Sequence, residues 1–301
     1  LRNEDTEIPV SVVARDNRGN EGSGSLDLTY VGVHDASIPR IVWIAPIDGG
    51  GLPAAQTVRT KLRVRATDDE GVTSVQFFLP GSTTPIEAVN AGNNIWEKDV
   101  DVVMGSAGSV ASIKATVHDA NSSNQQSVTV DVTAVTIEKT IPANFTHAIT
   151  STSDENFNKS VVVRGHLVLH IPATFKNLLV LDGGVVETLP SRPSQERKLD
   201  ITVNDILYVD SLSRVDVTGK GYLGGWQNDP DGTGDSNGDV RGRTIGNVNT
   251  GGPTAGASAS HGGLGGEFGT GVTNAVYGSI TSPDLLGTGG AGSQGGSPGG
   301  Q

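Results

Sequence analysis

The chain has no cysteine among its 301 residues. Disulfide bridges, zinc sites built on thiolates and thiol nucleophiles are therefore excluded. Aromatic residues make up only 4% of the sequence, so the core must be built mainly from aliphatic side chains. No stretch approaches the roughly 18 to 20 consecutive apolar residues that a membrane-spanning helix needs. We therefore expect no membrane span in this chain.

Basic residues are also scarce. The chain carries 21 Lys and Arg against 33 Asp and Glu, which gives a formal net charge of −12. Proteins that bind nucleic acid neutralise its phosphates with Lys and Arg, so we expect no nucleic-acid partner. An excess of carboxylates instead favours solubility and contact with divalent cations.

Short apolar segments alternate with turns between residues 160 and 225. The predicted strands are 161–163, 166–171, 178–181, 199–203, 206–209 and 215–217. Turn residues such as Gly165, Pro172 and Gly219 separate them, and in the last strands apolar and polar residues alternate with the period of a β-strand. Repeated short strands with few helix formers predict a β-solenoid, in which each coil stacks on the one before it.

The beginning of the chain contains two further predicted strands, 10–16 and 25–31, which are joined by a polar, Gly-containing turn. An isolated hairpin is only marginally stable in water. We therefore expect residues 1–35 to be the C-terminal hairpin of a domain whose first strands have been cut away.

An internal repeat supports this expectation. Segments 12–16 and 25–28 correspond to 115–119 and 127–130, where the second copy closes a unit that spans residues 36–135. The other strands predicted for this unit are 41–44, 61–68, 75–79, 85–90 and 96–103. About seven short strands in roughly 100 residues are the pattern of an immunoglobulin-like β-sandwich.

The stretch from Val64 to Val72, followed by Val75 to Phe78, resembles the Ig-like repeats that occur in tandem in large bacterial surface proteins. The resemblance covers roughly residues 1–135 and implies a fold, not an activity. Trp43 and Trp96 are candidate core aromatics, with ligand stacking as the alternative. Five acids near the strand ends and the junction between units fit either solvated turns or calcium ligands of the kind that cadherin-like domains hold: Asp16, Asp35, Asp68, Asp69 and Glu70.

Residues 136–159 join the two predicted domains. Pro142 and neighbouring β-branched residues disfavour a helix, and the polar run up to Asn158 has no apolar period. We expect this segment to be a linker, or a cap over the first coil, because an uncovered coil exposes unpaired strand edges.

The composition changes after Gly219. Residues 219–301 contain 27 of the 42 glycines and three basic residues, Lys220, Arg241 and Arg243. A disordered tail is one interpretation. The other is an ordered insertion over residues 226–301, because chains without Cβ atoms can pack closely as extended segments. The Gly219-Lys220-Gly221-Tyr222 turn and the glycine runs that follow resemble inserts in pectate-lyase-like, right-handed β-helix modules of very large secreted or surface bacterial proteins. That resemblance implies further coils beyond the insert.

Within the glycine-rich segment lies an acidic loop, from Asp229 to Asp239. Its oxygen-bearing side chains at alternate positions are the hard ligands that calcium requires, and the loop resembles the calcium repeats of thrombospondin type 3. It departs from an EF-hand because Val240 stands where a bidentate Glu is expected. A solvated acidic turn is the alternative. The predicted ligands of a structural calcium ion are Asp229, Asp231, Asp235, Asn237 and Asp239.

Two aromatic residues, Tyr222 and Trp226, flank Gly224 and Gly225. They fit two roles. They could form an exposed platform on which a sugar ring stacks, or they could cover the last hydrophobic coil.

Catalytic groups find little support in the sequence. Four aspartates lie on separate strands of the predicted solenoid with no basic partner recurring beside them: Asp200, Asp205, Asp210 and Asp216. Ser260, His261 and Asp284 could be assembled into a triad, but the strand-turn-helix elbow of such nucleophiles is missing. We interpret His261 as a packing or hydrogen-bonding residue, and we expect no enzyme.

The sequence thus predicts an all-β chain: Ig-like β-sandwich units, then a β-solenoid over residues 160–225 with a long glycine-rich segment. We expect a structural or adhesive module of a large extracellular bacterial protein, a fibre, stalk or adhesin stiffened by calcium. Its expected partners are other copies or domains of the same protein and cell-surface glycans. The alternatives are a carbohydrate-active β-helix and the scaffold of a secreted toxin.

The acidic loop generates the first testable prediction. A ligand that binds only the folded state raises its stability with the logarithm of ligand concentration over Kd. Chelation of calcium should therefore lower the melting temperature of the native chain, and Asp231→Ala/Asp235→Ala should abolish that response. Thermal unfolding with calcium and with a chelator measures both. If the melting temperature of the native chain is the same with calcium and with the chelator, the loop is a solvated turn and not a calcium site.

Overall fold

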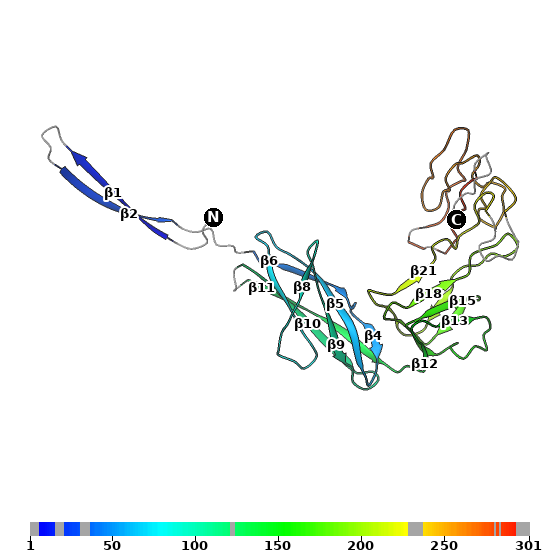
Figure 1. The fold of residues 1–301 in the computed structure, drawn as a ribbon, viewed down its shortest axis with the longest axis horizontal. Coiled ribbons are helices and arrows are strands. Elements are labelled where there is room, and N and C mark those ends of the chain that lie inside the picture. The colour runs from blue at the N-terminus through cyan, green and yellow to red at the C-terminus, as the bar shows by residue number, and fades with distance from the viewer. Residues whose placement is uncertain are drawn as a thin grey trace. The chain divides into compact units, whose positions relative to one another are not determined.

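The computed structural model describes residues 6–15, 21–30, 37–120, 124–227, 237–279, 281–282 and 284–292. These residues form strands, turns and bends and no helix, which confirms the all-β prediction (Figure 1). Nothing in this part of the chain qualifies as a helix able to span a membrane. The chain divides into two compact units. The first comprises Leu1–Ile47, Lys61–Val100 and Ser112–Val130, and the second comprises Asp48–Thr60, Asp101–Ala111 and Asp131–Gln301.

The predicted N-terminal hairpin is present. Strands β1 (Thr6–Arg15) and β2 (Glu21–Tyr30) pair antiparallel along their whole length, with Thr6 opposite Tyr30 and Arg15 opposite Glu21. The corresponding segments of the internal repeat, β10 (Val110–Asp119) and β11 (Gln125–Val135), are also neighbours in a sheet. The repeat in the sequence therefore marks a repeated strand pair.

Two larger sheets follow, with strand orders β4-β11-β10-β6-β7 and β3-β5-β9-β8. Their strands are β3 (Arg40–Ala45), β4 (Gly50–Pro53), β5 (Thr57–Thr67), β6 (Val72–Phe78), β7 (Ile86–Glu87), β8 (Val89–Gly92), β9 (Ile95–Val103), β10 (Val110–Asp119) and β11 (Gln125–Val135). Alternate residues of β5, among them Leu62 and Val64, are fully buried, as the period of two requires. Trp43 of β3 stacks on Phe77 of β6 with ring centroids 5.7 Å apart, so aromatic packing joins the two sheets.

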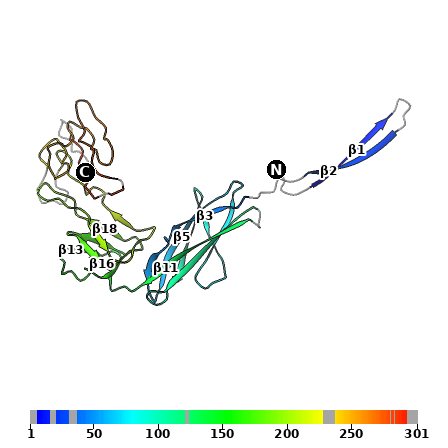
Figure 2. The ribbon, with the colours of Figure 1, turned by 180° about the vertical axis from the view of Figure 1, so that it is seen from behind.

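The remaining strands pair in parallel and form three stacks (Figure 2). One stack has the order β12-β14-β17-β20, a second the order β13-β15-β18-β21, and a third joins β16 to β19. Their bounds are β12 (Lys139–Ile141), β13 (Thr146–Ile149), β14 (Ser160–Val163), β15 (His166–Leu169), β16 (Ala173–Phe175), β17 (Asn177–Val180), β18 (Val185–Thr188), β19 (Ile201–Val203), β20 (Leu207–Val209) and β21 (Arg214–Asp216).

The stacks begin earlier than the sequence predicted. Residues 136–159, expected to be a linker or a cap, contribute β12 and β13, which pair in parallel with β14 and β15. Strands of three or four residues are too short to show a periodic pattern, which is why these two were missed. The rest of the segment does cover the interior, because Phe157 packs against the hydrophobic core.

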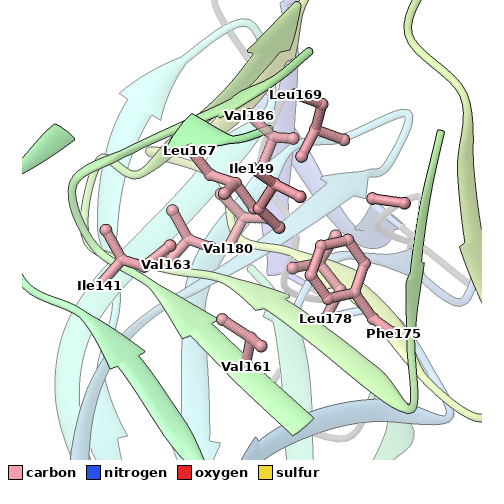
Figure 3. Packing of buried hydrophobic residues seen from close by; sticks show 11 residues of the cluster. Ile141, Ile149, Val161, Val163, Leu167, Leu169, Phe175, Leu178, Val180 and Val186 are labelled. Atoms are coloured by element: carbon pink, nitrogen blue, oxygen red, sulfur yellow. The ribbon is translucent and has the colours of Figure 1, made fainter. Parts of the chain in front are cut away.

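The interior of the stacks is aliphatic, with Phe175 as the aromatic member of its fully buried core cluster (Figure 3). The register places Val161 beside Leu178 and Val163 beside Val180, so each strand adds apolar side chains to the same column. Figure 3 shows the side chains of β12 to β18 converging on this interior.

The opposite face of the first stack is buried as well. Val162 and Leu179 are paired in register, as are Leu179 and Tyr208, and all three are buried although they point away from the interior cluster. A parallel sheet covered on both faces has continuous apolar runs, which explains Val161-Val162-Val163 and Leu178-Leu179-Val180. We call Val162, Leu179 and Tyr208 the outer row.

The outer row is covered by the β4 region, which belongs to the same compact unit. A Cβ atom added to Gly51 would lie 2.9 Å from Val135 Cγ2 and 3.1 Å from both Leu179 Cδ2 and Ile206 Cγ2, so any larger residue there would force these side chains to shift. The Tyr208 side chain forms a hydrogen bond with the Thr60 side chain, and burial raises the pKa of Tyr208. Asp48 and Gly49 form a turn, and the two glycines that follow, Gly50 and Gly51, begin β4, which pairs in parallel with β11.

The described glycine-rich residues pack backbone against backbone. Tyr222 N–H donates to Gly287 O at 2.9 Å, Arg243 N–H to Leu223 O at 2.9 Å and Gly292 N–H to Val240 O at 2.8 Å. A Cβ atom on Gly242 would overlap the carbonyl of Gly289. Such contact requires glycine, so in the described residues this composition builds an ordered layer.

Candidate functional site

The predicted calcium loop lies only partly within the described residues. Asp229, Asp231 and Asp235 fall outside them. Asn237 and Asp239 fall inside, and both are occupied by protein contacts. No group of three or more His, Asp or Glu side chains arranged to hold a metal occurs where the structure is described. The calcium site therefore stays a prediction.

Asn237 is a buried bridge between three segments. Its amide nitrogen donates to Gly224 O and to Arg241 O, both at 2.9 Å, and its amide oxygen accepts from Asn249 Nδ2 at 2.7 Å. A buried amide that forms three hydrogen bonds holds the backbone around it. The side chain thus has a structural role that needs no metal.

Asp239 forms an ion pair with Arg241. Its carboxylate accepts from Arg241 Nη2 at 2.8 Å and from the Arg241 backbone N–H at 2.9 Å. The side-chain hydrogen bonds from Arg241, followed by its backbone hydrogen bond, hold the pKa of Asp239 below its usual value. The pKa of Arg241 is raised by the same contact.

Tyr222 and Trp226 do not form a common platform. Tyr222 is 2% exposed and Trp226 is 42% exposed, so only Trp226 has an open face. The Tyr222 hydroxyl donates to Glu196 Oε2 at 2.8 Å, and burial raises the pKa of Tyr222. Tyr222 therefore fits the covering role and not the sugar-stacking one.

The acids near the first unit act in turns. Asp16 and Asp35 lie outside the described residues. Asp68 Oδ2 accepts from Glu70 N–H at 3.0 Å, and Ser37 Oγ donates to Asp68 and Asp69. These contacts fit the interpretation of solvated turn residues.

A cleft of about 430 Å³ lies between the parallel stacks and the glycine-rich layer, inside the second unit. Four separate stretches supply its walls: the end of β18, the residues before β19, the residues after β21, and the glycine-rich segment. The polar side chains that line it are Thr188, Lys198, Asp200, Lys220, His261 and Asp284, and the apolar ones are Leu199, Val217, Leu285 and Leu286.

Lys220 is held in place by an ion pair. Its Nζ lies 3.2 Å from Glu187 Oε2, and Glu187 Oε1 lies 3.8 Å from His166 Nδ1. The turn that carries Lys220 is closed by a hydrogen bond from its N–H to Val217 O at 3.1 Å. One ammonium group of the cleft is thus oriented before any ligand arrives.

Tyr277 contacts two residues that line the cleft, His261 and Leu286. Its ring contacts His261 edge to face with centroids 5.1 Å apart, and its hydroxyl donates to Leu286 O at 2.7 Å. This contact fits the interpretation of His261 as a packing residue, although its side chain is exposed and also lines the cleft. Ser260 is fully buried and its Oγ accepts from Gly265 N–H at 3.0 Å, so it cannot act as an exposed nucleophile.

One of the four aspartates has a basic partner, contrary to the prediction from the sequence. Arg214 Nε donates to Asp216 Oδ2 at 3.0 Å. Asp216 also accepts from Thr218 N–H, and these hydrogen bonds, the backbone one first, lower the pKa of Asp216 to about 2. Asp210 accepts from the N–H groups of Asp182 and Leu212. The carboxylates of Asp210 and Asp216 therefore fix turns and strand ends.

Sequence reasoning missed the cleft because its residues are far apart in the chain. Lys198 and Asp200 are about 60 residues from His261 and more than 80 from Asp284. Only the Gly219-Lys220-Gly221-Tyr222 turn was singled out, for its glycines and not for its lysine. No local spacing could have brought these groups together.

Comparison with known proteins identifies no family. No family model and no curated protein matches the chain. Among solved structures, an endo-β-1,4-mannanase from Thermotoga petrophila aligns over 34% of this chain and 21% of its own, with 15% identity and a TM-score of 0.27. An engineered protein solved at 1.98 Å aligns over 34% and 21%, with 22% identity and a TM-score of 0.26. This chain therefore spans about a fifth of each of these structures.

The Asp239–Arg241 pair generates a pH prediction. Because the pKa of Asp239 is lowered in the folded state, the ionised pair stabilises the fold above the unfolded pKa of about 3.9 and is lost as the pH falls through the folded pKa. Asp239→Asn should therefore melt at a lower temperature than the native chain above about pH 4, with the difference shrinking at more acidic pH.

Melting curves between acidic and neutral pH, recorded in a chelator so that no metal contributes, test this. Arg241→Gln is the matched variant, because it removes the cause of the lowered pKa and should show the same loss above the unfolded pKa. If the melting temperatures of Asp239→Asn and the native chain fell in parallel as the pH is lowered, the ionised Asp239–Arg241 pair would not be the source of the stability.

Proposed function

We propose that this chain is a structural module of a large extracellular bacterial protein, in which an Ig-like β-sandwich is firmly joined to a β-solenoid. The two sheets support the sandwich: their strands pair antiparallel except for β4 and β11, and Trp43 of one sheet stacks on Phe77 of the other. The three parallel stacks, each strand in register with the next, support the solenoid. The preceding hairpin is then the end of another Ig-like unit.

The observation that carries this proposal is the burial of the outer row. In a flexible two-domain chain, the outer face of the first stack would meet water and carry polar side chains. Instead Leu179 is fully buried, and Gly51 leaves room for its side chain. The residues of β4 and of the stacks therefore share apolar contacts, as expected of a part that transmits force or fixes a distance.

The same proposal accounts for the composition. The acidic composition and the lack of cysteine are compatible with an extracellular protein whose stability does not come from disulfides. The glycine-rich layer adds a broad surface beside the stacks. Other copies or domains of the same protein are its proposed partners, and calcium at the acidic loop is its proposed stiffening ion.

A distance measurement tests the joint. The chain has no cysteine, so spin labels on Ser106→Cys and Ser151→Cys, two exposed positions of the second unit, would be its only labels. We expect one narrow distance distribution in the native background. Leu179→Ala removes a fully buried side chain of the outer row, which costs about 2 to 5 kcal/mol, and it should broaden the distribution.

Leu264→Ala is the matched control, since Leu264 is exposed and surface substitutions usually change stability by less than about 0.5 kcal/mol. It should leave the distribution narrow. A broad distribution in the native background would contradict the firm joint and leave the two modules as beads on a linker.

The cleft favours a second function, carbohydrate binding. The charges that line it balance, because Lys198 and Lys220 share its lining with Asp200 and Asp284. Carboxylates accept from vicinal hydroxyls, ammonium groups donate to sugar oxygens, and Leu199 and Leu285 offer apolar contact to the C–H face of a sugar ring. A balanced lining predicts neutral sugars over acidic ones.

Calorimetry with cellohexaose, maltohexaose and chitohexaose tests this function, with polygalacturonate as the anionic comparison. At least one neutral oligosaccharide should bind, and Lys198→Met/Lys220→Met should weaken it roughly tenfold or more, because two charge-assisted hydrogen bonds are lost. Lys98→Met, which lies outside the cleft, should bind like the native chain. If the double variant binds equally well, or if no neutral oligosaccharide binds, the cleft is not a glycan site.

A further inference from the structure

The two carboxylates that line the cleft have no protein partner. Asp200 and Asp284 are exposed, and their side chains form no hydrogen bond or ion pair with any residue that the structure describes. Both residues are held by their backbones: Asp200 O accepts from Ala173 N–H at 3.0 Å, and Asp284 N–H donates to Ser282 O at 3.0 Å. Their carboxylates are therefore available to a ligand.

The two lysines of the cleft differ in the same respect. Lys220 Nζ lies 3.2 Å from Glu187 Oε2, and these two side chains are only 20% and 25% exposed. An ion pair so shielded from water is weakly screened by salt. Glu187 is not among the residues that line the cleft, so it neutralises Lys220 without being part of the lining. Lys198 is exposed and has no ion-pair partner in the described part of the chain.

The formal charges around the cleft therefore do not cancel. The two lysines and the two aspartates of the lining balance one another, and Glu187 adds one negative charge. Asp216, the register neighbour of Glu187, adds none, because it forms an ion pair with Arg214. In a partly enclosed site with apolar walls, charges attract more strongly than in open water. The excess of one negative charge thus favours a ligand that carries a positive charge.

We propose that the cleft binds an amino sugar whose amine is free and protonated. The ammonium group donates charge-assisted hydrogen bonds to the carboxylate of Asp200 or Asp284. Lys198 donates to sugar hydroxyls, and Leu199 and Leu285 contact the C–H face of the ring. This inference rests on the carbohydrate binding proposed above, and it names the class of sugar.

A basic peptide carries the same ammonium chemistry, but the walls of the cleft favour a sugar. Peptides are commonly bound by pairing with the edge of a sheet or by an apolar groove that takes a helix. Among the described residues that line the cleft, Thr188 alone belongs to a strand, and its hydroxyl already donates to Leu169 O at 2.8 Å. The other walls are turns and irregular segments, so the cleft presents no strand edge to a peptide.

Two hexasaccharides with one backbone test the charge of the ligand. Chitohexaose has an acetamido group on each ring, and the glucosamine hexamer made by removing its acetyl groups has amines instead. Calorimetry in physiological salt at neutral pH, where histidine side chains are mostly uncharged, compares the two. The glucosamine hexamer should bind roughly tenfold more tightly, because it adds a charge-assisted hydrogen bond. Tetralysine, which has ammonium groups but no sugar ring, should bind more weakly than the glucosamine hexamer.

Glu187→Gln is the decisive variant, because it frees the charge of Lys220 and leaves the lining unchanged. It should lower the ratio of the two hexamer affinities by about fivefold, the effect of one partly exposed charge. Asp284→Asn removes a carboxylate of the lining and should lower the ratio by a similar factor. The matched control is Asp101→Asn, which removes one negative charge from an exposed position of β9 and should keep the native ratio. Melting curves show whether each variant is folded.

The outcomes distinguish this inference from the binding function on which it rests. If chitohexaose binds and the glucosamine hexamer binds no more tightly, the amino-sugar assignment is overturned and glycan binding stands. The assignment is also overturned if Glu187→Gln leaves the ratio unchanged, or if tetralysine binds as tightly as the glucosamine hexamer. If neither hexamer nor any neutral oligosaccharide binds, both proposals fail.

Discussion

The burial of one parallel sheet on both faces is the constraint on which the rest of the second unit depends. Strands β14 and β17 send Val161, Val163, Leu178 and Val180 into the interior and Val162 and Leu179 to the outside, and all of these side chains are buried. A strand buried on both faces cannot carry polar residues in alternation, so its sequence is continuously apolar. The cover on the outside must then come from another part of the chain, and β4 supplies it through Gly51.

Glycine allows close approach between parts of the chain in two places. At Gly51 a side chain would press against Leu179 and Ile206, so the absence of a Cβ atom lets two apolar surfaces meet. In the glycine-rich layer, the absence of Cβ atoms lets backbones approach until their carbonyl and amide groups pair directly, as at Tyr222 and Gly287. Each ordered glycine costs conformational entropy. The hydrogen bonds of Asn237 and Tyr277 with this backbone, together with buried Leu223, offset that cost.

How much the sequence predicts depends on whether the signal is local. Some strands can be recognised directly, from the apolar runs at Val161 and Leu178 and from the alternation in β5. The burial of a strand face determines which of its consecutive residues are apolar, so the signal is local. β12, β13, β16 and β18 have only three or four residues each, too few for a period, and their identity comes from parallel pairing with distant strands. β4 begins with two glycines that have a turn-like composition, and it is a strand because β11 lies beside it. The cleft depends wholly on long-range placement, so its lysines and acids carry no local mark.

The polar side chains divide by the contacts they make, and this division separates structure from function. Four polar side chains form hydrogen bonds with backbone groups or with a neighbouring arginine: Asn237, Asp239, Asp210 and Asp216. Their role in holding turns is enough to explain why these residues are polar. The side chains around the cleft differ, because they converge from separate stretches on one space lined with apolar residues. The ammonium group of Lys220 is oriented there by its ion pair with Glu187, in addition to the turn that carries the residue. A chain that serves only as a spacer has no need to gather opposite charges around a cavity, and this contrast is what favours the proposed binding function of the cleft.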